Sequence, residues 1–121
     1  IVQSILKQIE VDQVIFIDAL KTEHLEHLGK TIQITNRGIS PGSGIDNVRK
    51  ELSSTILGKE VLAIGIPTVV DLRSVFNPTK VLEHFMVTPT NIDFLVEKLA
   101  LLVGDGLNLS LHKNKIRQNY F

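Results

Sequence analysis

Two aspartates stand where open α/β proteins keep their chemistry. Asp18 follows the apolar run VIFI at residues 14–17, and Asp71 closes the run VLAIGIPTVVD at residues 61–71. The active crevice of an open α/β sheet lies beyond the carboxyl ends of its strands, so the two carboxylates could share a cleft as general acid and base. An aspartate after a strand is also often a helix cap or a turn former, so position alone leaves both interpretations open.

A glycine-rich loop, GISPGSG at residues 38–44, is the second candidate. It leads into an expected helix, so its backbone N–H groups could bind an anion with the help of the helix dipole. A P-loop would need a lysine after its second glycine, and a dinucleotide fingerprint read from Gly42 and Gly44 has Asn47 in place of its third glycine. An anion-binding domain over residues 38–47 therefore competes with a simple turn.

The remaining polar candidates give weaker signals. His24 and His27 are spaced to share a metal on a helix, but no cysteine joins them and their surroundings are polar, which favours a solvated helix face. Ser43, Ser53, Ser54 and Ser110 do not lie in a GxSxG nucleophile elbow, so they give no support for a serine hydrolase. The sequence predicts no metal site and no cofactor.

Composition excludes several classes of protein. The 121 residues include 13 basic and 13 acidic side chains, so there is no basic field to attract nucleic acid, and we expect no nucleic-acid partner. No apolar stretch is long enough to cross a membrane, and the amino terminus does not resemble a signal peptide. The absence of cysteine excludes disulfides and agrees with a reducing compartment.

Apolar strands that alternate with helices predict an α/β fold with a mostly parallel sheet. The expected strands are residues 13–17, 31–35, 61–66 and a brief one in FMVTP, 85–89. The first strand is expected to end before Asp18, and the third at Pro67, which cannot donate to a ladder. The expected helices are residues 1–10, a turn or two ending at Gly29, residues 46–57 with Gly58 at the end, residues 79–84, and a long helix from Thr88-Pro89 that continues or restarts beyond Gly104 and Gly106.

Several longer motifs resemble the germination protease family in order and spacing. They cover nearly the whole chain up to His112, and the loop PGSG together with IPTVVD is the most specific part. The motifs are IDAL (17–20), TIQI (31–34), GISPGSGIDNVRKEL (38–52), VLAIGIPTVVD (61–71), FMVTPTNID (85–93) and GLNLSLH (106–112).

The resemblance implies a spore endopeptidase that degrades small acid-soluble spore proteins in the cytoplasm of the spore core. It also implies a zymogen, a homotetrameric assembly, a fold similar to hydrogenase-maturation proteases, and a metal-free aspartate mechanism. The family's IDAL motif places a catalytic carboxylate at Asp18. Its PGSG and IPTVVD motifs place cleft or supporting residues at Gly42, Ser43, Gly44, Thr68 and Asp71.

The resemblance places the second catalytic carboxylate, the partner of Asp18, upstream of Ile1, and the first expected helix begins without a capping residue. We therefore expect residues 1–112 to be the carboxyl-terminal part of a catalytic domain. Residues 113–121 are expected to be a polar basic tail. We expect these 121 residues alone to be inactive. The family's Asp-Thr-Gly-Ile-His is replaced by Asn36, Arg37, Gly38, Ile39 and Ser40. The alternative is a noncatalytic spore or regulatory module that retains the fold.

Overall fold

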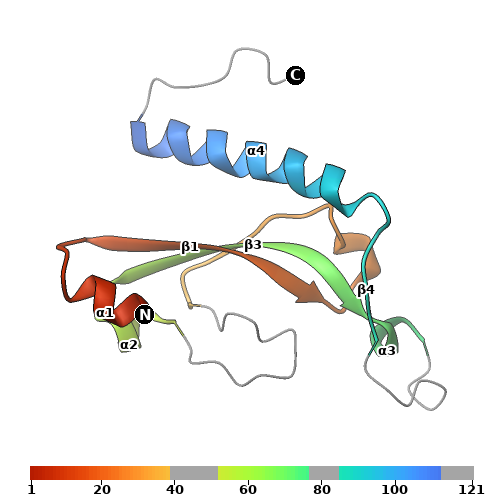
Figure 1. The fold of residues 1–121 in the computed structure, drawn as a ribbon, viewed down its shortest axis with the longest axis horizontal. Helices are drawn as coiled ribbons and strands as arrows, with labels where there is room; N and C mark the ends of the chain where they lie inside the picture. The colour runs from red at the N-terminus through yellow and green to blue at the C-terminus, as the bar shows by residue number, and fades with distance from the viewer. Residues whose placement is uncertain (39–51, 77–84, 113–121) are drawn as a thin grey trace.

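A four-stranded sheet with one long helix across it forms the body of the molecule (Figure 1). The computed structural model describes residues 1–38, 52–76 and 85–112. Its strands are β1 (Gln13–Thr22), β2 (Gln33–Thr35), β3 (Glu60–Asp71) and β4 (Met86–Val87). Its helices are α1 (Val2–Leu6), the 3₁₀ turn η1 (Leu25–His27), α2 (Ser54–Leu57), α3 (Leu72–Val75) and α4 (Ile92–His112). These elements confirm the expected α/β class.

The sheet is mixed, so the expectation of a mostly parallel sheet was wrong. Strand β3 lies in the centre and pairs in parallel with β1, but β2 and β4 both pair with β3 in the antiparallel direction. Only residues 23–32 connect β1 to β2, and this connection holds a single 3₁₀ turn. A parallel crossover needs a dozen or more residues, so the chain reverses direction instead.

The two long strands extend further than their apolar runs suggested. Strand β1 continues to Thr22, which places Asp18 inside the strand and not beyond its carboxyl end. Strand β3 passes through Pro67, because the register shifts there: Leu20 pairs with Pro67, and Lys21 pairs with Val69. A proline is tolerated at such a bulge because the ladder is already interrupted.

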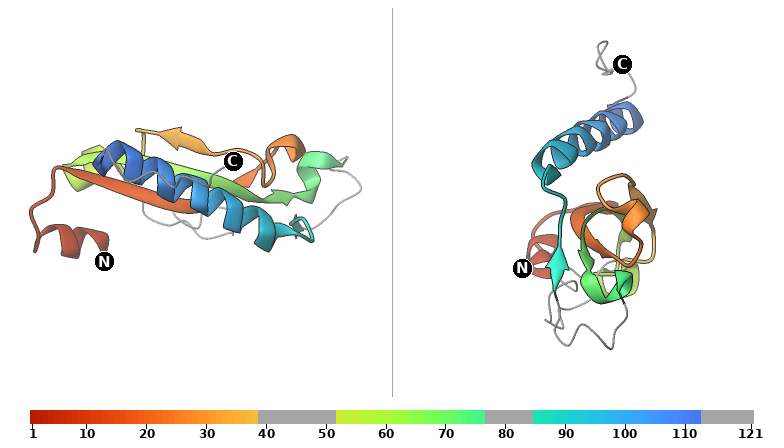
Figure 2. Two further views of the ribbon diagram at one scale, coloured as in Figure 1. Left: turned by 90° about the horizontal axis from the view of Figure 1, so that it is seen from above. Right: turned by 90° about the vertical axis from the view of Figure 1, so that its right-hand side faces the viewer.

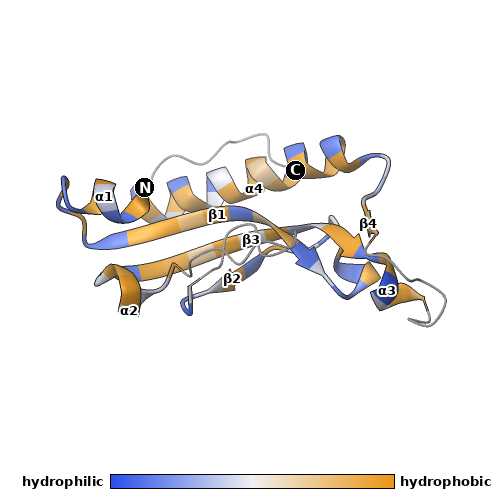
Figure 3. Ribbon diagram, turned by 60° about the horizontal axis from the view of Figure 1, so that its bottom comes forward, coloured by the Kyte–Doolittle hydropathy of each residue, from blue (hydrophilic) through white to orange (hydrophobic). Residues whose placement is uncertain are grey.

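Helix α4 lies along one face of the sheet, as the two orientations of Figure 2 show. The buried residues at this contact are Ile64 and Ile66 of β3 and Val103 of α4. Figure 3 shows that β1 and β3 are hydrophobic over most of their length, whereas the end of β1 is hydrophilic. Burial of these apolar side chains, worth roughly 25 cal/mol per Å² of area removed from water, holds the helix on the sheet.

The long helix differs from its prediction at one end and agrees at the other. It begins at Ile92 and not at Pro89, because the Thr88 hydroxyl donates to the carbonyl of Thr68 at 2.7 Å and so ties residue 88 to β3. It then continues without a break through Gly104 and Gly106 to His112. None of the helices in the described ranges is long and apolar enough to span a membrane.

The short helices agree with the sequence mainly at their ends. Residues 52 and 53 were expected inside a helix, but α2 begins only at Ser54, capped by Ser53, whose Oγ accepts the N–H of Ile56 at 3.4 Å. Gly58 ends α2 in the left-handed conformation, φ 67°, as expected. Residues 46–51 of that expected helix, the helix at 79–84 and the tail at 113–121 lie outside the described residues.

Candidate active site at Asp18

Asp18 lies at the middle of β1, directly opposite Gly65 of β3. Its side chain is half-buried, and its Oδ1 accepts the backbone N–H of Ala19 at 2.9 Å. Within the part of the chain that the structure describes, Asp18 forms no ion pair. The carboxylate therefore keeps acceptor capacity for a further donor, such as a water molecule or a substrate amide.

A groove of about 360 Å³ opens between β1, β3 and α4, and residue 18 is part of its lining. The Asp18 side chain itself lies on the sheet face away from α4, because its partner Gly65 stands between Ile64 and Ile66, which pack on the helix side. Apart from Asp18 and Thr68, the lining consists of apolar side chains and one glycine. The lining residues are Ile17, Asp18, Ala19, Ile66, Thr68, Val96, Ala100, Val103 and Gly104. A concave apolar surface with few polar groups is the usual form of a ligand site.

The absence of a side chain at Gly65 leaves space for the side chain of Leu20, next to Asp18 on β1. A Cβ atom at residue 65 would lie 2.5 Å from Cγ of Leu20, a distance that real Cβ atoms do not show. Leu20 and Asp18 are two residues apart on β1 and so share a face of the strand. The missing side chain at residue 65 thus lets Leu20 pack against β3 beside Asp18.

Asp71 lies at the junction of β3 and α3, where it caps the helix. It is buried, it ends β3, and its Oδ1 accepts the N–H of Arg73 at 2.9 Å as the N-cap of α3. Its Oδ2 lies 3.5 Å from the guanidinium of Arg73. Asp18 is paired with Gly65, which lies six residues before Asp71 on β3. At the rise of about 3.3 Å per residue in a strand, the two aspartates are therefore about 20 Å apart along the sheet. The structure therefore does not bring the two aspartates into one cleft.

Of the other sequence candidates, Thr68 joins Asp18 on the wall of the groove, while Gly42, Ser43 and Gly44 lie outside the described residues. The α4 side of the groove was not among the predicted site residues. The signal was present, because Val96, Ala100 and Val103 follow the i, i+4, i+7 spacing of one helix face.

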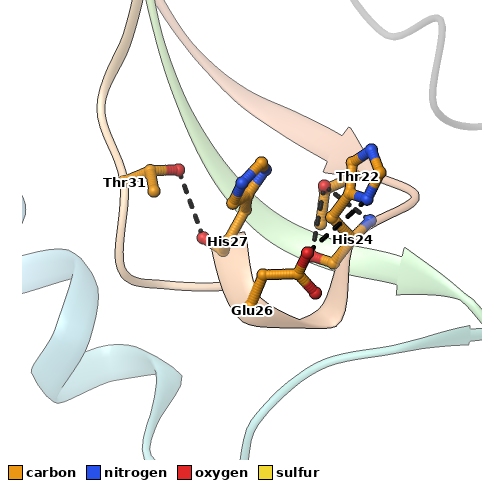
Figure 4. Close-up of polar contacts among 5 residues, drawn as sticks. All are labelled: Thr22, His24, Glu26, His27 and Thr31. Carbon is orange, nitrogen blue, oxygen red and sulfur yellow. Dashed lines mark hydrogen bonds and ion pairs between the residues drawn. The ribbon is translucent and has the colours of Figure 1, made fainter.

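Of the two neighbouring histidines, His24 is exposed and His27 is half-buried, and both lie in the turn that follows β1 (Figure 4). Nδ1 of His24 is 3.7 Å from Oε1 of Glu26, with side chains 64% and 71% exposed, and the rings of His24 and His27 are 5.1 Å apart. The Oγ1 of Thr22 accepts the N–H of His24, which fixes the turn after β1. Across the described ranges, no group of three or more His, Cys, Asp or Glu residues could hold a metal ion.

Comparison with known proteins assigns the chain to a family of peptidases. A family model described as germination protease matches residues 1–86. The chain belongs to the germination protease family.

The curated relatives carry the same name and are about twice as long. The germination protease of Caldanaerobacter subterraneus subsp. tengcongensis is 36% identical over 92% of this chain and 46% of the relative. Those of Clostridium perfringens and Bacillus licheniformis are 30% and 47% identical over 98% of this chain, and 49% and 51% of the relatives. The chain thus spans about half the length of these relatives. The alignment to the Bacillus licheniformis protein has 188 positions, more than the 121 residues of this chain, so the relative has residues within the aligned span that this chain lacks.

Proposed function

We propose that the protein to which this chain belongs is an endopeptidase that degrades small acid-soluble spore proteins during germination, with Asp18 as one of two catalytic carboxylates. Membership in the germination protease family is the observation that carries the proposal. The half-buried position of Asp18 in an edge strand, without an ion pair among the described residues, supports it, because such a carboxylate keeps acceptor capacity for a water molecule.

The proposed mechanism uses a pair of carboxyl groups without a metal. When two carboxyl groups lie close together, like-charge repulsion raises the pKa of one of them, so that one is ionised while the other holds a proton. The ionised member removes a proton from a water molecule, which attacks the peptide carbonyl. The protonated member then gives its proton to the leaving amine nitrogen. Asp18 supplies one member, and the second comes from residues outside this chain.

This assignment gives Asp71 and Thr68 supporting roles. Asp71 fixes the end of β3 by capping α3, and Thr68 joins the groove wall to the segment before α4 through its carbonyl. The roles of Gly42, Ser43 and Gly44 beside the cleft, the zymogen state, the homotetrameric assembly and the location in the spore core remain part of the proposal through the family.

The test is cleavage of a purified small acid-soluble spore protein by the complete protein and by its Asp18→Asn variant, followed by mass spectrometry of the products. We expect Asp18→Asn to lower the rate by about 100-fold or more, because positioned acid–base groups contribute that much. Asp12→Asn, which changes an exposed carboxylate just before β1, is the matched control and should keep the wild-type rate. Equal rates for the wild type and Asp18→Asn would remove Asp18 from the mechanism.

The second candidate function is a noncatalytic interaction module. It is favoured by the replacement of the family's Asp-Thr-Gly-Ile-His at residues 36–40, which removes an acid and a histidine. The same assay separates the two functions: a complete protein that binds the spore protein but leaves it intact is a module. The isolated 121 residues should be inactive under either function, because one carboxyl group of the pair is missing, and turnover by them would contradict the two-carboxylate mechanism.

A further inference from the structure

The pairing register of the sheet places a third residue in line with Asp18 and Gly65. Gly65 of β3 pairs with Asp18 of β1 on one side and with Gln33 of β2 on the other. Residues that pair directly across two strands carry their side chains on the same face of the sheet. Asp18 and Gln33 therefore point to one face, with the backbone of Gly65 between them.

The neighbour of Gln33 shows which face this is. Ile34 pairs with Ile64 of the core and lines a groove beside the second half of α4. Successive side chains of a strand point to opposite faces, so Gln33 points away from α4, as Asp18 does. Gln33 is exposed and Asp18 is half-buried, so solvent reaches both side chains.

An apolar floor separates the two polar side chains. Gly65 has no side chain of its own, and the branched end of Leu20 lies over it, where a Cβ atom would be only 2.5 Å from Cγ of Leu20. Ala63 and Pro67 of β3, which share this face with Gly65, are buried. Apolar surroundings strengthen a hydrogen bond to a developing charge, because water competes for it less.

The separation of the two side chains fits a peptide group and one water molecule. Two strand spacings of about 4.8 Å put the Cα atoms of Asp18 and Gln33 roughly 10 Å apart. A hydrogen bond from water to a carboxylate, the approach of that water to a carbonyl carbon, the carbonyl bond and a hydrogen bond from an amide together also span about 10 Å. A substrate carbonyl between the two side chains would thus meet a water molecule on one side and the amide on the other.

Gln33 has the chemistry to complete this arrangement. Its side-chain amide carries two N–H donors and does not titrate. Among residues 1–38, 52–76 and 85–112, the side chain of Gln33 forms no hydrogen bond, so both donors are available to a ligand. Asp18 and Gln33 together offer an acceptor for a proton of the attacking water and a donor for the carbonyl oxygen.

We propose that Gln33 is a catalytic residue of the protease: its side-chain amide donates a hydrogen bond to the carbonyl oxygen of the scissile peptide bond. This inference rests on the proposed function, because only a water molecule activated by Asp18 makes the space beside Gln33 the place of reaction. The water oxygen bonds to the carbonyl carbon while its proton passes to the ionised carboxylate, and an electron pair of the C=O bond moves to the oxygen. The amide of Gln33 stabilises the negative charge on that oxygen. The C–N bond then breaks as the protonated carboxyl group gives its proton to the nitrogen.

The first test measures kcat and KM of the complete protein on a purified small acid-soluble spore protein. Gln33→Met keeps the length of the side chain and removes its donors. We expect kcat to fall about 100- to 1,000-fold, as for other single donors to a developing oxyanion, while KM stays within about twofold. An unchanged kcat would overturn the role of Gln33. A wild type that leaves the spore protein intact would instead refute the proposed function, and this inference with it.

Gln13→Met is the matched control. Gln13 is an exposed glutamine of β1 that lines the groove on the α4 face, so the same chemical change is made on the opposite side of the sheet. We expect this variant to keep the wild-type kcat. Equal losses of kcat in the two variants would attribute the effect to the sheet as a whole and overturn the catalytic role of Gln33.

The second test needs no cleavage. A peptide with the sequence of a cleaved site, in which a phosphinate replaces the scissile amide, carries a charged oxygen where the oxyanion develops. In isothermal titration calorimetry with Asp18→Asn protein, adding Gln33→Met should weaken this probe about tenfold or more, because the probe loses a hydrogen bond to a charged group. The unmodified peptide should lose less than about twofold. Equal affinity of the two proteins for the phosphinate would show that the amide of Gln33 does not reach the oxyanion.

Discussion

Replacing Gly65 with alanine should destabilise the sheet at the residue opposite Asp18. The new Cβ would lie 2.5 Å from Cγ and 3.1 Å from Cδ2 of Leu20, so the whole branched end of this side chain must move and not only one methyl group. Forcing an extra carbon into a packed site costs about 1 to 3 kcal/mol. Replacing glycine by alanine inside a strand also stabilises the folded state by about 0.5 to 1 kcal/mol, because glycine loses more conformational freedom on folding. The net loss in the free energy of unfolding should be on the order of 1 to 2 kcal/mol.

Urea denaturation followed by far-ultraviolet circular dichroism measures this loss, since the chain contains no tryptophan to report by fluorescence. A double-mutant cycle with Leu20→Ala isolates the cause. Leu20→Ala removes the obstructing group, so the double variant should be more stable than the sum of the single changes predicts, by about 1 to 3 kcal/mol. Gly65→Ala with wild-type stability, or strictly additive effects of the two substitutions, would show that the close approach of Leu20 to residue 65 is not what requires the glycine.

Two further pairs of substitutions test the cap of α3 and two glycines in turns. Asp71→Ala should lower the free energy of unfolding by about 1 to 2 kcal/mol, because it removes the cap of α3. Asp71→Asn should lower it less, because it keeps the cap and loses only the ion pair with Arg73. Equal losses for the two variants in chemical denaturation would contradict the capping role. Gly29→Ala should lower the melting temperature more than Gly58→Ala. Both glycines have φ near 66°, but only a Cβ at Gly29 would press on Leu95, 2.7 Å from its Cδ1. Equal decreases in melting temperature would show that Leu95 can move away without loss of stability.

The strand cores were predictable from the sequence because burial on both faces requires continuous apolar runs. The ends of the strands were not. Asp18 was expected beyond β1 because a carboxylate rarely lies in the middle of a buried strand, yet β1 is at the edge of the described sheet, where a polar side chain can still reach solvent. Pro67 was expected to end β3, but a bulge in β3, where Thr68 has no partner on β1, accommodates the missing N–H.

Strand direction and the composition of the site depended on contacts that no local pattern contains. The residues of β2 alternate in polarity, which is compatible with either direction, and only the short connection of residues 23–32 decides it. Asp71 and Asp18 have the same local signature, an apolar run followed by an acid. What distinguishes them is that Arg73 follows Asp71 at the spacing of a helix cap, while Asp18 lies in the middle of β1, paired with Gly65 of a strand about 45 residues later in the chain.

The place of Asp18 on an edge strand also bears on the self-association of this chain. In the part of the sheet that the structure describes, β1 has a ladder partner on one side only, and such an edge is a template on which a second chain can add. Antiparallel stacking of two β1 strands centred on residue 18 would set two carboxylates against each other, which disfavours fibril-like self-association. Neutralising this carboxylate therefore removes a barrier to aggregation as well as an acid–base group, and preparations of the asparagine variant should scatter more light than the wild type at equal concentration.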